Sequence, residues 1–250
     1  MGLSHSPSIT ADGLVLCLDA ANRRSYPGSG SMWLDLSGRA NNASLVNSPV
    51  FSSNNAGGIV FDGVNDYSII TNFNEDSNDA LSVFAWVNLT SETLYSNGNY
   101  MNWIINKRDN SNDMQWQLIT FRDPSDINIR VPHVAIMSGS STIGLSLYNG
   151  DSSAIRELNL NEWGFVGFTT SGVSGGFLRV YLNGLLNTYT TLSANRGKGS
   201  RDLIIGDTAW QYPGIIQWDG LISGIQIYNR ALSADEVRSN YLATKSRFGL

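Results

Sequence analysis

Three oxygen-bearing side chains crowd one predicted turn of this chain. Asp62, Asn65 and Asp66 lie within the segment Asp62-Gly63-Val64-Asn65-Asp66. A calcium ion takes about six to eight hard oxygen ligands at roughly 2.4 Å, and these side chains would supply part of such a set. The same residue types are also favoured in turns for their local hydrogen bonds. The pattern therefore predicts either a calcium site completed from elsewhere or a turn without metal, and it indicates no other cofactor.

Aromatic side chains embedded in polar segments form a second candidate site. Sugar rings stack their apolar faces on exposed Trp and Tyr side chains, so such segments can bind glycans. The alternative is that the rings plug the ends of the fold or become buried against another subunit, since aromatics also dominate protein interfaces. The candidates are Tyr95, Tyr100, Trp103, Trp210, Tyr212 and Trp218.

The residue pattern offers little for acid and base catalysis. Many acidic residues stand beside Asn, Gly or Ser, as in Asp109-Asn110-Ser111-Asn112-Asp113, which is typical of solvated turns. The imidazoles are His5, near the N-terminus, and His133, beside Pro132, and no nucleophile-elbow sequence accompanies them. We therefore expect no catalytic residue and interpret His133 as a core or surface histidine.

Composition bounds the fold class and the kinds of partner. The chain has 250 residues, of which 42% are hydrophobic and 15% charged, with 25 glycines. This balance favours many strands joined by tight polar turns, so we expect an all-β domain. The formal net charge is −5, and the basic residues are scattered along the sequence. Nucleic acid is therefore not an expected partner, because phosphate binding needs a concentrated positive patch.

The cysteine content and the N-terminal sequence both favour a protein made in the cytosol. Cys17 is the single cysteine, lies in an apolar run and is interpreted as a small core residue. A chain without a disulfide framework suits a reducing cytosol. The first residues lack the basic and apolar regions of a signal peptide, and no run reaches the roughly 18 apolar residues of a membrane span. We expect a chain made without a leader and no membrane partner.

Local signals predict strands, turns and one helix. Ser82 to Leu89 is apolar on both faces, which indicates a strand inside a sandwich. The turn at Asp62-Gly63 predicts a hairpin between its flanking strands, and Asn183-Gly184 predicts a type I′ hairpin. Ser233 followed by Glu236 is a capping box that starts a short C-terminal helix. Residues Thr90 to Ala154 fit the pattern least well, and we expect them to carry loops specific to this protein.

Several phrases in order resemble the concanavalin A-like, laminin-G-like jelly-roll family. They are "GLVLCLDA", "WLDLSG", "VFDGVNDY", "LNEWGFVGFT", "RVYLNG", "DLIIGD" and "DGLISGIQIYNRALSADEV". The resemblance implies a jelly-roll β-sandwich of two antiparallel sheets with one short C-terminal helix. Relatives often bind calcium at a sandwich edge, and some are retaining glycanases that carry Glu-x-Asp-x-x-Glu on one strand. That signature does not occur in this sequence.

The opening "GLVLCLDAANRRSYPGSGSMWLDLSG" and the ending "NYLATKSRFGL" resemble jelly-roll modules in structural proteins of tailed bacteriophages. The resemblance implies a non-enzymatic virion protein, made in the bacterial cytoplasm, that decorates the capsid or attaches to head or tail. Its partners would be phage coat or tail proteins, with self-association as a further option. The alternative is a lectin-like module that binds a host-surface glycan.

The expected organisation is one domain between two short terminal segments. Residues 1–12 form an N-terminal arm, 13–243 the jelly roll and 244–250 a C-terminal tail. The tail carries cationic and aromatic side chains, and we expect it to contact a partner during assembly. The contact residues are Lys245, Arg247 and Phe248.

Overall fold

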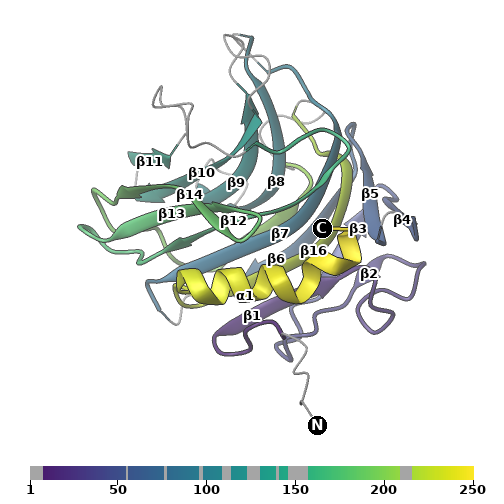
Figure 1. Ribbon diagram of the computed structural model, residues 1–250, viewed down its shortest axis with the longest axis horizontal. Helices are drawn as coiled ribbons and strands as arrows, with labels where there is room; N and C mark the ends of the chain where they lie inside the picture. Colours follow the sequence, from purple (N-terminus) through teal and green to yellow (C-terminus); the bar gives the residue numbers. More distant parts are fainter. Residues whose placement is uncertain are drawn as a thin grey trace.

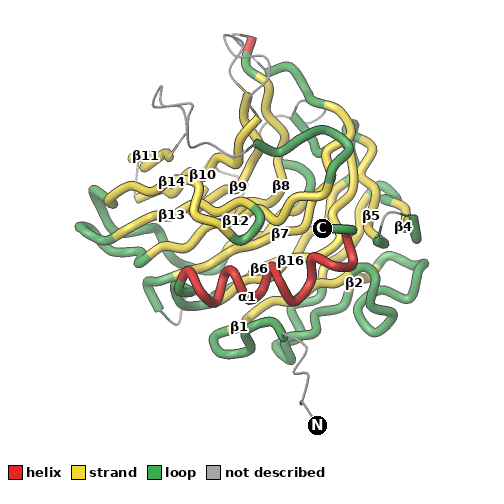
Figure 2. Tube along the Cα trace, viewed as in Figure 1, coloured by secondary structure: helices red, strands yellow, loops and turns green. Residues whose placement is uncertain are grey.

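The protein is a sandwich of two antiparallel β-sheets with one helix on its outside (Figures 1 and 2). The computed structural model describes residues 8–54, 56–75, 78–95, 98–108, 114–122, 130–138, 141–145, 157–208 and 216–250. The predicted fold class is confirmed, including the C-terminal helix. Neither helix among these residues is long and apolar enough to cross a membrane.

The first sheet, which we call sheet A, is built around the central strand β16. Its order is β14 (Leu185–Thr191), β13 (Phe177–Leu182), β12 (Trp163–Thr170), β7 (Leu81–Ser91), β16 (Asp219–Tyr228), β5 (Gly58–Asp62) and β4 (Val50–Ser52), and β1 (Leu14–Asp19) also pairs with β16. Strand β16 pairs with β5 through its first residues and with β1 through its last residues. The last strand of the chain is thus hydrogen-bonded to strands from the N-terminal region.

The second sheet, sheet B, takes most of its strands from the middle of the chain. Its order is β11 (Ser141–Leu145), β10 (Arg130–Ser138), β9 (Met114–Arg122), β8 (Tyr100–Arg108), β15 (Arg201–Ile205), β6 (Tyr67–Phe73), β3 (Ala43–Val46) and β2 (Met32–Trp33). Four of its strands lie where sequence-specific loops were expected. That expectation was wrong for β8 to β11, which pair as successive neighbours in the sheet.

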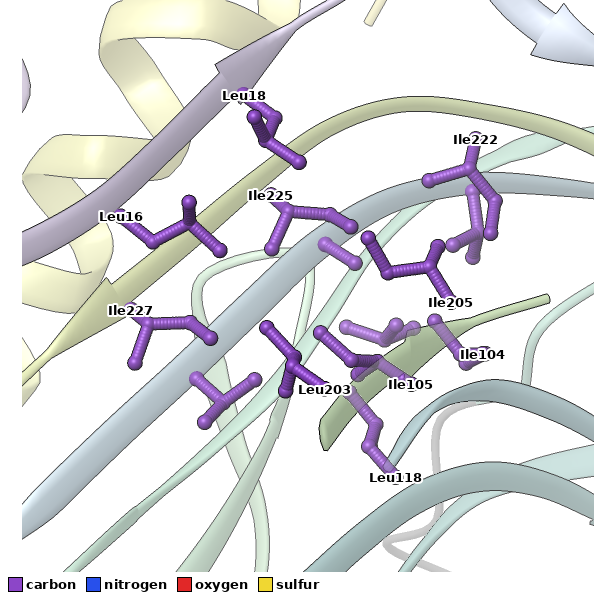
Figure 3. Packing of buried hydrophobic residues seen from close by; sticks show 14 of the residues in the cluster. Leu16, Leu18, Ile104, Ile105, Leu118, Leu203, Ile205, Ile222, Ile225 and Ile227 are labelled. Carbon is purple, nitrogen blue, oxygen red and sulfur yellow. The ribbon is translucent and has the colours of Figure 1, made fainter. Parts of the chain in front are cut away.

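Aliphatic side chains from both sheets fill the space between them. Figure 3 shows isoleucines of β16 lying close to side chains of β8 and β15. Burial of each large apolar side chain contributes about 1.5–3 kcal/mol, so this layer holds the sheets together. Cys17, as predicted, is buried, and burial together with Asp19 and Asp35 raises the pKa of its thiol to about 12.

Strand β7 is buried on both faces, as its sequence predicts. Val83, Ala85, Val87 and Leu89 face the core between the sheets. Phe84 and Trp86 face the opposite way, into a second apolar cluster with the C-terminal helix. This helix, α1 (Ala234–Thr244), lies across the outer face of sheet A (Figure 1).

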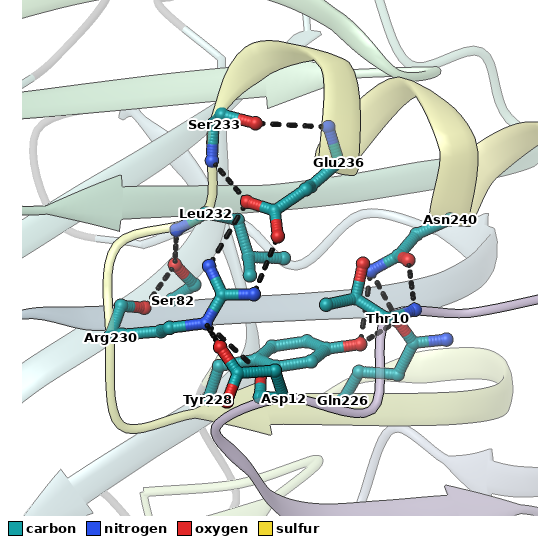
Figure 4. Close-up of polar contacts among 10 residues, drawn as sticks. All are labelled: Thr10, Asp12, Ser82, Gln226, Tyr228, Arg230, Leu232, Ser233, Glu236 and Asn240. Atoms are coloured by element: carbon teal, nitrogen blue, oxygen red, sulfur yellow. Dashed lines mark hydrogen bonds and ion pairs between the residues drawn. The ribbon is translucent and has the colours of Figure 1, made fainter.

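The start of α1 has the predicted capping box. Ser233 Oγ accepts a hydrogen bond from the Glu236 N–H, and the Glu236 carboxylate accepts one from the Ser233 N–H (Figure 4). The Arg230 guanidinium also binds this carboxylate. The Arg230 hydrogen bond is the main reason that the pKa of Glu236 falls to about 2. The helix start is therefore fixed by local side chains.

Two predicted hairpins have different outcomes. Asn183 and Gly184 have φ angles of 53° and 73°, and they join the paired strands β13 and β14, so the type I′ turn is confirmed. The hairpin at Asp62-Gly63 was wrong. Strand β5 belongs to sheet A and β6 to sheet B, so this turn carries the chain from one sheet to the other.

The C-terminal residues pack onto the domain. A short 3-10 helix, η2 (Lys245–Phe248), follows α1 directly. The Phe248 ring stacks on Trp86 at a centroid distance of 3.9 Å and is 9% exposed. The N-terminal side is attached as well, since the Thr10 N–H donates to Asn240 Oδ1 at 2.8 Å. Thr10 and Phe248 thus both contact the domain, and the predicted domain bounds stay a prediction.

Candidate functional site

Two adjoining hollows lie between the loop after β1 and the segment around β4. The larger has a volume of about 500 Å³ and the smaller about 270 Å³, and Tyr26, Gly28 and Phe51 line both. Volumes of roughly 300–1,000 Å³ are usual for small-ligand sites. We call the two hollows together the Tyr26 groove. It is lined by residues 20–21, 23, 26–31, 45, 47–51, 53 and 56–57.

An aromatic pair separates the two hollows. The rings of Tyr26 and Phe51 are 5.7 Å apart between centroids and inclined at 48°. The Tyr26 hydroxyl donates to the Gly30 carbonyl at 2.8 Å, and burial raises the pKa of this hydroxyl. Phe51 packs against the core but keeps part of its ring exposed. The pair therefore forms a fixed apolar wall in a polar loop region.

Hydrogen bonds within the loop hold this wall in place. The Tyr26 N–H donates to the Asn22 carbonyl at 2.8 Å. The Ser25 hydroxyl, which is fully buried, accepts from the Asp19 N–H and donates to the Leu34 carbonyl. The Leu34 N–H in turn donates to the Ser25 carbonyl. The groove is therefore formed before any ligand binds, which limits the entropy lost on binding.

Arg247 fastens the base of the groove. Its guanidinium donates to Asp19 Oδ1 at 2.7 Å and to Ser223 Oγ at 2.7 Å. The Ser223 hydroxyl donates to the Gly57 carbonyl, and its own carbonyl accepts from the Ala20 N–H. Ala20 and Gly57 line the groove. Arg247 and Ser223 therefore connect the two segments that carry these residues to strand β16. An assembly contact through Arg247 stays a prediction.

Polar groups around the wall are mostly uncharged. Exposed hydroxyl and amide side chains on the groove are those of Ser29, Ser31, Asn47, Ser48 and Ser53. Arg23 is the charged side chain among the described lining residues, which include no Asp or Glu. Such a surface can bind a hydroxyl-rich ring by stacking and hydrogen bonding. The described lining residues supply no carboxylate pair for general acid and base catalysis.

The predicted aromatic residues do not form one surface. Trp103 is 6% exposed and packs with Ile119 and Ile216, while Trp218 is fully buried in the core. The Arg122 guanidinium lies 3.8 Å from the Tyr100 ring centroid and covers one face of that ring. Trp218 is thus part of the core between the sheets, whereas Trp103 belongs to a separate cluster. Their burial in the chain itself removes them as stacking platforms.

Other members of the aromatic set are placed differently. Tyr95 is partly buried against the Trp103 cluster. Trp210 and Tyr212 lie outside the described residues. For these two positions the glycan prediction stays a prediction.

The Asp62 turn is held by its own hydrogen bonds. Asp62 Oδ1 accepts from the N–H groups of Val64, Asn65 and Asp66 at 2.9, 3.1 and 3.3 Å. Partial burial works against ionisation of Asp62, but these donors outweigh it and lower the pKa. Burial first, and then the charge of Asp62, raises the pKa of Asp66 to about 6.

Calcium binding at this turn stays a prediction. Within the described ranges, no group of three or more His, Cys, Asp or Glu side chains is arranged to hold a metal ion. The observed hydrogen bonds of Asp62 are those that the alternative, a turn without metal, requires.

His133 is not among the described residues that line the groove. His133 lies on β10 opposite Ile119, which in turn lies opposite Trp103 on β8. Burial lowers the pKa of His133 to about 4, so its ring is neutral at physiological pH. Among the described residues, its Nδ1 has no hydrogen-bond partner. His5 lies outside the described part of the chain.

The predicted C-terminal contact residues have separate roles. Phe248 is packed on Trp86 and is 9% exposed, and its assembly contact stays a prediction. Lys245 is half-buried, with its Nζ 5.7 Å from the Tyr241 ring centroid. An assembly contact through Lys245 stays a prediction.

A family model for the concanavalin A-like lectin/glucanases superfamily matches residues 62–238, well over half of the chain. The chain belongs to this superfamily. A search of curated proteins finds no match. The matched segment contains most strands of both sheets and the first part of α1, in agreement with the observed fold.

Solved structures of the same fold include one domain of nearly the same size. Domain 4 of AbnA, an extracellular GH43 arabinanase from Geobacillus stearothermophilus solved with arabinotriose, superposes with a TM-score of 0.64 at 16% identity over 92% of this chain and 98% of that domain. The botulinum neurotoxin serotype D binding domain gives 0.62 at 16% identity, over 92% of this chain and 52% of that one.

A longer enzyme contains the same fold. A mutant of Trypanosoma rangeli sialidase that displays trans-sialidase activity gives a TM-score of 0.63 at 17% identity, over 97% of this chain and 35% of the sialidase. This chain therefore spans about half of the neurotoxin domain and about a third of the sialidase. At these identities the likeness concerns the fold alone.

Sequence reasoning did not find the groove. Neither Tyr26 nor Phe51 is among the candidate residues that the sequence predicts. An available signal was the aromatic ring within Ser25-Tyr26-Pro27-Gly28, since an aromatic residue beside Pro and Gly has little local reason to be there. Its partnership with Phe51 depends on tertiary packing.

Proposed function

We propose that this protein is a non-enzymatic carbohydrate-binding module whose ligand lies in the Tyr26 groove. The observation that carries the proposal is the fixed Tyr26–Phe51 wall bordered by exposed serine and asparagine side chains. A sugar presents an apolar face of C–H groups and a rim of hydroxyls. The exposed part of the Phe51 ring suits the first, and the polar rim suits the second.

The similar structures support this choice of ligand class. Domain 4 of the arabinanase was solved with arabinotriose, and it matches this chain over nearly its whole length. A domain of this size and fold can therefore bind an oligosaccharide. The position of the ligand in this chain is argued from the groove itself and not from that domain.

The absence of catalysis is part of the proposal. A retaining glycosidase needs two carboxyl groups about 5 Å apart, one as nucleophile and one as acid. The described lining of the Tyr26 groove contains neither Asp nor Glu. The groove suits a protein that holds a saccharide without cleaving it.

The Phe51→Ala variant tests the proposal. Loss of the stacking ring should weaken binding of the best ligand on a glycan array about tenfold, as measured by isothermal titration calorimetry. Tyr189→Ala is the matched control, because Tyr189 is 69% exposed on the edge strand β14 and does not line the groove. Wild-type protein that binds no saccharide, or a Phe51→Ala variant that binds like wild type, would contradict it.

The virion role implied by the resemblance stays a prediction. A saccharide-binding module could act as a head or tail accessory of a phage particle, in which case both functions would hold together. Copy number in purified particles tests this role, because hundreds of copies would indicate a capsid decoration and a handful a tail component.

A further inference from the structure

The charge of the Tyr26 groove differs from that of the whole chain. The protein has 21 acidic and 16 basic residues, giving a formal net charge of −5. The described residues that line the groove nevertheless include Arg23 and no acidic side chain. The groove is therefore a locally positive site on a negative protein.

The Arg23 guanidinium is available to a ligand. Its side chain is exposed at the smaller hollow and makes no ion pair with any described residue. Asp19, at the end of the preceding strand β1, is already engaged, since its Oδ1 accepts from Arg247 at 2.7 Å and from the Ala21 N–H at 3.1 Å. Arg247 thus neutralises an acid beside the groove, and Arg23 has no acidic partner in the part of the chain that the structure describes.

The backbone that carries Arg23 is held on both sides. Asn22 Oδ1 accepts from the Arg24 N–H at 3.0 Å, and the Asn22 carbonyl accepts from the Ser25 N–H at 2.8 Å. Arg23 therefore projects from a fixed turn beside the aromatic wall. A guanidinium in such a place can donate two parallel hydrogen bonds to an oxyanion.

We infer that the ligand of the Tyr26 groove is an acidic saccharide whose carboxylate or sulfate is bound by Arg23. This inference rests on the proposed function. The sugar ring lies against the Phe51 side of the wall, and the oxyanion points toward the guanidinium. Arg23 is the charged side chain on the described lining of the groove, so the acidic group is bound at this position.

A solvent-exposed guanidinium should raise the affinity for an acidic saccharide moderately. A hydrogen bond to a charged group contributes more than a neutral one, so the acidic saccharide should bind about tenfold more tightly than its neutral counterpart. The preference should shrink at high salt, because the distance over which exposed charges interact falls to about 3 Å at 1 M ionic strength.

The test compares matched saccharides and matched variants. The probes are oligogalacturonates, oligomannuronates, sialylated oligosaccharides and sulfated oligosaccharides, each beside its carboxyl-reduced or desulfated counterpart. Titration calorimetry is run on wild type, Arg23→Gln and Arg24→Gln. Arg24 is the control because it carries the same charge on the same turn but does not line either hollow.

We expect wild type to prefer at least one acidic probe about tenfold, Arg23→Gln to lose this preference and Arg24→Gln to keep it. The pair that shows the preference identifies the oxyanion as carboxylate or sulfate. Equal binding of acidic and neutral probes, or a preference that survives in Arg23→Gln, overturns the inference while leaving saccharide binding intact. Wild type that binds no probe in either form overturns both this inference and the proposed function.

Discussion

Two regions of the molecule contain aromatic side chains in polar sequence, and they differ in what surrounds the rings. At the Tyr26 groove, the Tyr26–Phe51 pair stands between two hollows with exposed hydroxyl side chains. In the Trp103 cluster, formed by Trp103, Ile119 and Ile216, the indole packs against aliphatic side chains and is 6% exposed. The first arrangement leaves room for a ligand, whereas the second stabilises the sheet.

The difference arises from how each ring is attached to the fold. Trp103 lies within strand β8, and its backbone N–H donates to the Ile216 carbonyl, so a segment distant in sequence lies against it. Tyr26 lies in a loop that Asn22 and Ser25 bend into a fixed shape beside β4. Aromatic rings in polar segments therefore indicate a binding surface when the loop is rigid and its far side is left open.

Truncation of a packed ring should have the largest effect. Trp218 is fully buried in the core between the sheets. Trp218→Ala should lower the free energy of unfolding by about 3–5 kcal/mol in urea titrations, because it removes a large apolar side chain and leaves a cavity. The control Tyr189→Ala, at an exposed position, should change the free energy of unfolding by less than about 0.5 kcal/mol. A stable Trp218→Ala protein that has lost saccharide binding would reverse the comparison.

The face of sheet B near Trp103 should respond to acid. The pKa of His133 is about 4 in the folded protein, against about 6.5 when exposed. Between these values the unfolded chain binds a proton that the folded chain does not, so stability present above pH 6.5 is lost as the pH falls toward 4. Wild type should lose up to about 3 kcal/mol more than His133→Gln across this window. Parallel stability curves for the two proteins would disprove this assignment.

A smaller effect is expected below the groove. Arg247→Ala removes the hydrogen bonds that connect Asp19, at the end of β1, to Ser223 on β16. We expect a loss of about 1–2 kcal/mol in stability and a severalfold weaker affinity for saccharide. Lys245→Ala, on the same 3-10 helix, is the control and should change neither. Unchanged saccharide affinity in Arg247→Ala would show that the groove does not need this support.

Local signals in the sequence predicted the elements that local chemistry determines. The Ser233–Glu236 capping box and the Asn183-Gly184 turn depend on residues close in sequence, and both are present. The Asp62-Gly63 turn also has the expected hydrogen bonds, yet its strands belong to different sheets. Turn chemistry fixes the bend of the chain but not the partners of the strands that follow.

The candidate site lay beyond local signals for the same reason. Tyr26 follows β1, which pairs with β16, and Phe51 lies on β4, which pairs with β5 and through it with β16. Arg247, far along the chain, also joins Asp19 to Ser223. None of these contacts is encoded in a short motif. Burial of Trp103 and Trp218 is likewise decided by sheet packing and not by their polar neighbours in sequence.

The most direct test is a crystal structure of the protein with the saccharide that binds most tightly on the array. Our account predicts the sugar ring against Phe51, its hydroxyls on the serine-rich rim and its oxyanion on Arg23. A ligand found over the segment that carries Tyr95 and Tyr100, or anywhere outside the Tyr26 groove, would contradict the account.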